Sequence, residues 1–189
     1  DPRGAVSLII GMRARRMKVG SIMGNHEYVM LCALGYYGED RKREWAGPWL
    51  REFSSERTFL SYGVEPGRLD ELAKAIPSEH IGFLRSLPWC AEMEGHLAVH
   101  AGLIPDEPFR SQLKELRRRD GVRGRSPWLH DQSLVHAPPP PDCPLVVVSG
   151  HVKQQSVVVA DRRILIDTTG GRGGVLSAVM IPEMHVLTS

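Results

Sequence analysis

The stretch Ile22-Met23-Gly24-Asn25-His26-Glu27 is the first of three segments that share one design. In each segment, a short apolar run predicts a β-strand that ends in a polar side chain beside glycine. The other two are Ala98-Val99-His100-Ala101-Gly102 and Val148-Ser149-Gly150-His151. Layered α/β proteins place ligand sites where strands end at one edge of a sheet. Small neighbouring residues let a metal ion or a phosphate approach the backbone closely.

The periodicity of apolar residues around these segments predicts a mixed chain of helices and strands. Helices are expected over residues 4–16, 28–34, 43–53, 67–75, 79–87 and 109–118. Strands are expected over residues 18–23, 89–94, 97–100, 145–149, 156–160, 163–167, 175–181 and 184–187. The fold class that this order indicates is α/β, with helices and sheet packed in layers as one domain over residues 1–189.

Residues 119–144 contain four consecutive prolines, Pro138 to Pro141. Proline is excluded from the interior of a helix and from a central strand. We therefore expect an irregular surface loop here. We do not expect a domain boundary, because the strands that follow are too few to fold alone.

The composition excludes several classes of protein. Lys and Arg number 24 against 22 Asp and Glu, which gives a formal net charge of +2 and no reason to expect nucleic acid or a membrane surface as a partner. No apolar run approaches the ~20 residues that span a bilayer. The three cysteines lie far apart and form no Cys-x-x-Cys pair, so neither a disulfide framework nor a structural zinc site is indicated. A reducing, cytoplasmic location is expected.

Asn25, His100 and His151 together offer one amide oxygen and two imidazoles. This is a credible ligand set for a borderline divalent ion such as Mn, Fe or Zn. It is incomplete without a carboxylate to balance charge and to bridge to a second metal. Taken singly, each histidine has an alternative interpretation as a hydrogen-bonded structural residue, and only the combination and its order favour a metal site.

The three segments resemble the last three metal motifs of the phosphoprotein phosphatase family, which has the calcineurin-like metallophosphoesterase fold. The matching residues are Gly24-Asn25-His26-Glu27, His100-Ala101-Gly102-Leu103, Gly150-His151, and a closing Ile166-Asp167-Thr168-Thr169-Gly170-Gly171. The intervening Ser61-Tyr62-Gly63-Val64 and Ala75-Ile76-Pro77 are similar to the bacterial-type members, and within them to the Rhizobiales-like phosphatases. The resemblance runs from about Arg3 to the end of the chain.

The resemblance implies a role for each matching residue. Asn25, His100 and His151 would bind one of two divalent ions, and His26 would be the general acid that protonates the leaving oxygen. The two ions would lie ~3.5–4 Å apart and activate a bridging hydroxide for in-line attack on phosphorus. Histidine suits proton transfer because its ordinary pKa lies near neutrality. Arg125 is the candidate phosphate-binding residue, with an exposed loop arginine as the alternative.

Two further motifs of the family, Gly-Asp-x-His-Gly and Gly-Asp-x-x-Asp-Arg-Gly, do not occur in this sequence. They would supply the other metal's ligands and the bridging carboxylate. We therefore expect the chain to be an N-terminally truncated part of a longer protein. At most one metal site would be partly retained, and the chain alone would have negligible turnover because neutral ligands cannot hold two dications together.

The function that the resemblance implies is hydrolysis of phosphomonoesters on phosphorylated protein or peptide, on either Ser/Thr or Tyr. Two alternatives remain open. One is an inactive pseudophosphatase that binds phosphorylated partners or one metal. The other is a nucleotide phosphoesterase, such as a dinucleotide hydrolase of the same superfamily.

Overall fold

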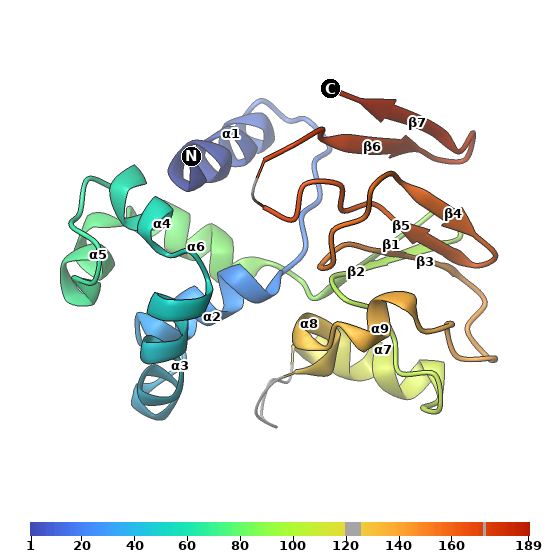
Figure 1. Ribbon diagram of the computed structural model, residues 1–189, viewed down its shortest axis with the longest axis horizontal. Helices are drawn as coiled ribbons and strands as arrows, with labels where there is room; N and C mark the ends of the chain where they lie inside the picture. Colours follow the sequence, from blue (N-terminus) through green and yellow to red (C-terminus); the bar gives the residue numbers. More distant parts are fainter. Residues whose placement is uncertain (120–125, 172) are drawn as a thin grey trace. The chain divides into compact units, whose positions relative to one another are not determined.

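Figure 1 shows the computed structural model of the chain, which describes residues 1–119, 126–171 and 173–189. Backbone contacts divide the chain into two compact units. The first unit consists of Asp1–Ser21 with Asn25–Leu87, and the second of Ile22–Gly24 with Pro88–Ser189. Within these described ranges, no helix is both long enough and apolar enough to cross a membrane.

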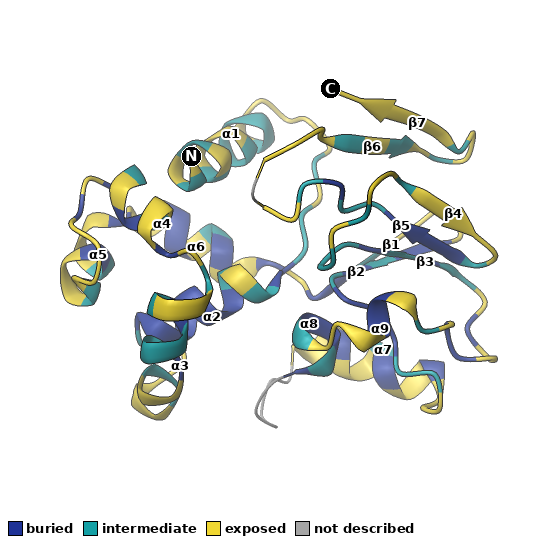
Figure 2. Ribbon diagram, in the orientation of Figure 1, coloured by how far each residue is buried: buried dark blue, intermediate teal, exposed yellow. Residues whose placement is uncertain are grey.

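The first unit is built from helices. They are α1 (Pro2–Ala14), α2 (Asn25–Ala33), α3 (Glu39–Glu52), α4 (Glu56–Ser61), α5 (Leu69–Ala75) and α6 (Ser78–Ser86). Large aromatic side chains form its core, and the rings of Trp49 and Phe59 lie 5.4 Å apart. Every residue of helix α2 from Tyr28 to Ala33 is buried, whereas its first three residues are half-buried or exposed (Figure 2).

The thiol of Cys32 lies in this buried helix, and burial raises its pKa to about 11 from the ordinary 9.0. The folded chain therefore holds the thiol proton more tightly than the unfolded chain does. The resulting stability is complete below pH 9.0 and is lost as the pH rises through about 11.

We expect the free energy of unfolding to fall by about 2 kcal/mol between about pH 8.5 and pH 10.5 through this group alone. Urea unfolding of the parent and of Cys32→Ala at the two pH values measures this fall in the free energy of unfolding. The decline should be smaller in the variant by that amount, and an equal decline in both proteins would contradict the assignment.

The second unit contains a sheet with the strand order β1-β2-β3-β5-β4. These strands are β1 (Cys90–Met93), β2 (His96–Val99), β3 (Val146–Ser149), β4 (Val158–Ala160) and β5 (Arg163–Leu165). The central pairs β2–β3 and β3–β5 are parallel, whereas β1 and β4 pair antiparallel at the two edges. A separate hairpin pairs β6 (Ser177–Met180) with β7 (His185–Thr188).

Three helices belong to the same unit, α7 (Phe109–Arg118), α8 (Pro127–His130) and α9 (Ser133–His136), on one side of the sheet in Figure 1. Gln112 of α7 connects α7 to α8 and is almost completely buried, at 1% exposed. Its amide oxygen accepts from the backbone N–H of Ile104 and from the indole N–H of Trp128, and its amide nitrogen donates to the carbonyls of Ile104 and Glu107.

Replacing Gln112 with leucine is expected to lower the free energy of unfolding by about 2–3 kcal/mol. Leucine fills a similar volume but leaves buried donors and acceptors without partners, which costs more than the hydrogen bonds themselves contribute. Chemical denaturation of the variant measures the loss, with the exposed Gln155→Leu as its control. A loss no larger than that of the control would contradict the buried network.

Most predicted elements occur within a few residues of their expected positions, and three expectations were wrong. Residues 18–23 form no strand. The amide of Met23 donates to the carbonyl of Pro88 at 2.8 Å, but proline has no N–H to continue a ladder. Helix α4 was not predicted. Residues 119–144 are not wholly irregular, because α8 and α9 lie within them before the prolines begin.

Candidate functional site

His100 and His151 lie one and two residues beyond the ends of two neighbouring strands of the second unit. Strand β2 ends at Val99 and β3 ends at Ser149, and the two strands run parallel with Ala98 opposite Val148. Parallel strands bring their carboxyl ends to the same edge of a sheet. The amide of Gly150 donates to the carbonyl of His100 at 3.0 Å, which continues the pairing beyond the strands.

The two imidazoles lie against each other at this edge. Nδ1 of His151 is 3.1 Å from Nε2 of His100, and the ring centroids are 4.8 Å apart with the planes inclined at 64°. Both residues are half-buried. His151 has a φ of 68°, in the left-handed region that a residue with a Cβ seldom adopts. Strained backbone of this kind is concentrated at functional sites.

The separation of the two nitrogen atoms fits a shared metal ion. Two nitrogen ligands at ~2.1 Å from one ion, at angles near those of tetrahedral or octahedral coordination, stand about 3.0–3.4 Å apart. The observed 3.1 Å between Nε2 of His100 and Nδ1 of His151 falls in that range. Among the residues described, no group of three or more His, Cys, Asp or Glu side chains is placed to hold a metal. A metal site here therefore needs donors beyond the histidine pair.

The segment that follows His100 is held by backbone contacts to α8 and α9. The amide of Ala101 donates to the carbonyl of Trp128 at 2.9 Å. Gly102 packs so closely against Leu134 that a Cβ would lie 2.8 Å from the carbonyl carbon of Leu134. This close approach is the reason that Gly102 must be a glycine, since its backbone does not adopt a positive φ.

Arg163 is a buried cation of the same region that the sequence reasoning missed. Its guanidinium donates to the carbonyls of Val135 and Ala137 and reaches the hydroxyl of Ser149 at 3.4 Å. Burial lowers the pKa of this guanidinium. The side chain ties the end of α9 to the end of β3, two residues before His151. An arginine within the apolar run Arg163–Leu165 was the only sequence signal for it.

Asp167 belongs to the segment Ile166-Asp167-Thr168-Thr169-Gly170-Gly171. One carboxylate oxygen of Asp167 accepts from the backbone N–H groups of Thr169 at 3.1 Å and Gly170 at 2.7 Å. The amide of Gln154 donates to the carbonyl of Asp167 at 2.7 Å. These contacts assign Asp167 a role in shaping the turn after β5.

Asn25 and His26 are the first two residues of α2, in the first unit. Asn25 is half-buried and His26 is exposed, with its ring edge-on to that of Phe53 at 5.1 Å. The structure thus brings together two of the predicted metal ligands, His100 and His151. The roles of Asn25 and His26 stay predictions, and Arg125 lies outside the described residues.

No family model matches the chain, and no curated protein matches it either. Among solved structures, the chain is similar to the "Crystal structure of a putative diadenosine tetraphosphatase", with a TM-score of 0.55 and 20% sequence identity. The similarity covers 97% of this chain and 72% of that one. It confirms the predicted fold class, a mixed α/β arrangement in which helices flank a sheet with parallel strands, in agreement with a metallophosphoesterase-like fold.

Proposed function

We propose that the protein containing this chain is a metal-dependent phosphoester hydrolase, with phosphorylated protein or peptide as its first candidate substrate. The observation that carries the proposal is the histidine pair: two imidazole nitrogens 3.1 Å apart at the carboxyl ends of adjacent parallel strands. The fold likeness supports it, because the similar solved structure bears the name of a hydrolase of a phosphorylated compound, and α/β sheets bind ligands at the carboxyl ends of their strands.

In this proposal, His100 and His151 hold a divalent ion, Mn, Fe or Zn, and Asn25 adds an oxygen ligand. When bound, such an ion polarises a phosphoryl oxygen and supplies a nucleophile near neutral pH. His26 donates a proton to the leaving oxygen, and its exposure is compatible with meeting a substrate from solvent. Arg163 acts only through Ser149 and α9, by fixing the end of the strand that precedes His151.

A second candidate substrate is a dinucleotide such as diadenosine tetraphosphate. It is favoured by the similar solved structure, which bears the name of a diadenosine tetraphosphatase, and the fold suits it as well as a phosphoprotein. A third candidate is a pseudophosphatase that binds without turnover. It is favoured by the lack of any cluster of three His, Cys, Asp or Glu side chains in the described ranges.

The test uses the protein expressed from the complete reading frame that contains this chain, supplied with Mn²⁺. Phosphotyrosine peptide, phosphoserine peptide and diadenosine tetraphosphate are offered separately. We expect metal-dependent phosphate release from a phosphopeptide, reduced on the order of a hundredfold or more by His26→Asn. Preferential cleavage of diadenosine tetraphosphate would show that a dinucleotide, and not a phosphopeptide, is the substrate. Binding of phosphopeptide with no release from any substrate would favour the pseudophosphatase.

A further inference from the structure

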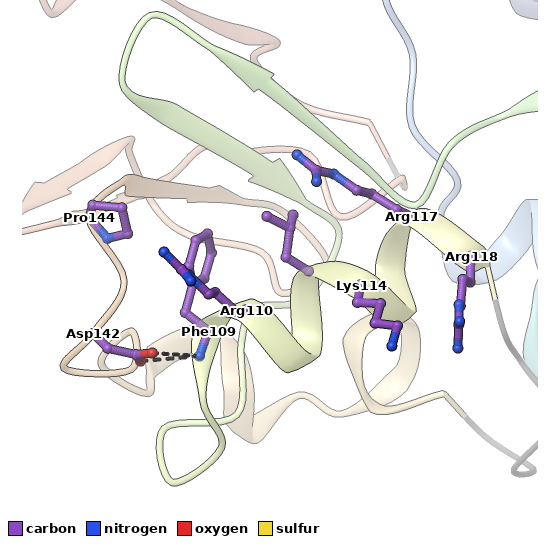
Figure 3. Close-up of a pocket in the computed structure, with 8 residues that line it drawn as sticks. Phe109, Arg110, Lys114, Arg117, Arg118, Asp142 and Pro144 are labelled. Atoms are coloured by element: carbon purple, nitrogen blue, oxygen red, sulfur yellow. Dashed lines mark hydrogen bonds between the residues drawn. The ribbon is translucent and has the colours of Figure 1, made fainter.

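Helix α7 presents four cationic side chains that the proposed hydrolysis does not use. They are Arg110, Lys114, Arg117 and Arg118, and all four are exposed. Their spacing of four, three and one residues places them along one side of the helix. Figure 3 shows them extending from α7. All four line an open pocket with a volume of about 850 Å³.

The floor of this pocket is apolar. Phe109 and Leu113 of α7 line it together with Pro144, and Phe109 is buried while Leu113 is half-buried. This face of α7 therefore combines long cationic side chains with an adjacent apolar strip, whereas a face that only meets solvent needs no apolar strip. It can pack against an apolar side chain while the cations meet neighbouring negative charges.

The negative groups near the pocket already have partners. Both carboxylate oxygens of Asp142 accept from the backbone N–H of Phe109 at 3.1 Å, which caps the start of α7. Glu92 of β1 pairs with Arg117 at 2.6 Å. No ion pair is described for Arg110, Lys114 or Arg118 within the part of the chain that the structure covers. Asp142 keeps its negative charge because the N–H that it accepts from is neutral, but the lining residues still carry four positive charges against this one negative charge.

Helix stability does not account for this arrangement. Arg117 and Arg118 lie in the last turn, where the helix dipole favours cations. Arg110 lies in the first turn, where the dipole disfavours them, and no acidic residue accompanies it there. Lys114 is also three or four positions from Arg110, Arg117 and Arg118, and like charges at this spacing destabilise a helix.

We propose that the α7 pocket binds an acidic peptide segment of a partner protein, with one apolar residue among its carboxylates. From Arg110 to Arg118 the helix rises about 12 Å, which an extended peptide spans with about four residues. The apolar residue packs on Phe109, Leu113 and Pro144, and the carboxylates meet the flanking cations. This inference does not depend on the proposed phosphoesterase function.

A peptide fits these features better than a nucleic acid does. Single-stranded nucleic acids are held by exposed aromatic rings that stack on bases. The one aromatic side chain among the described lining residues, Phe109, is buried. The net charge of the whole sequence is only +2, so the positive charge is local.

The experiment measures fluorescence anisotropy of a labelled peptide, Glu-Asp-Glu-Leu-Glu-Asp, titrated with the 189-residue chain in about 20 mM salt. The pocket variant is Arg110→Gln with Lys114→Gln. The matched control is Arg57→Gln with Lys74→Gln, which removes the same charge from exposed helical positions of the first unit. We expect the pocket variant to weaken binding roughly fivefold or more, and the control to leave it within about twofold.

Changes to the probe test the same contacts without altering the protein. Replacing the peptide's leucine with serine should weaken binding, and replacing its acids with Gln and Asn should abolish it. Equal weakening by the pocket variant and its control would reduce the effect to net charge and overturn the proposal. So would an unchanged affinity for the serine peptide, or tighter, pocket-dependent binding of a single-stranded RNA hexamer.

Discussion

Replacing His151 with alanine is expected to weaken the binding of Co²⁺ by this chain about a hundredfold or more. The variant loses one of two nitrogen donors that stand 3.1 Å apart, and a single imidazole from His100 cannot chelate an ion. Co²⁺ is a useful probe because its visible absorption reports the ligands and their geometry, independently of any hydrolysis.

The control for this experiment is His185→Ala, which removes an exposed histidine of β7 and should leave Co²⁺ affinity unchanged. His100→Ala should behave as His151→Ala does, and the double variant should be little worse than either, because both histidines serve one ion. Unchanged affinity in both single variants would show that the pair is a structural hydrogen bond. That alternative is the one the sequence leaves open for each histidine.

Gly102→Ala is expected to lower the free energy of unfolding by about 3–5 kcal/mol. A Cβ at this position would collide with the carbonyl oxygen of Leu134 and lie 2.8 Å from its carbonyl carbon. These are backbone atoms of α9, whose end is fixed by hydrogen bonds from Arg163. Neither backbone segment can move away without breaking hydrogen bonds or packing contacts. Any shift of the backbone would occur at Gly102, two residues after His100.

The matched control is Gly82→Ala in α6. A Cβ there meets nothing within 4 Å, and alanine favours the helix. We expect this variant to be more stable than the parent by about 0.5–1 kcal/mol. Urea unfolding measures both changes, and the Co²⁺ affinity of Gly102→Ala shows whether the clash also disturbs the histidine pair. A loss below about 1 kcal/mol for Gly102→Ala would contradict the tight packing against α9.

The sequence predicted the local structure well where local forces decide it. The apolar spacing of residues 109–118 predicted the limits of α7, and the strands expected over residues 156–160 and 163–167 contain β4 and β5. The expected strand over 18–23 failed because a strand also needs a neighbour that can exchange hydrogen bonds. That requirement depends on Pro88, which lies far away in the sequence.

The order of the polar residues at strand ends is a property of the sequence alone, and it identified His100 and His151 as candidates. What brings them together is the parallel register of β2 with β3, which joins segments 51 residues apart. Such pairing is decided by packing over the whole unit. The tertiary structure also decided that Arg163 is buried and that the cations of α7 are exposed. An arginine side chain has the same chemistry in both positions. Only its surroundings distinguish Arg163, which supports the histidine pair, from the arginines of the α7 pocket.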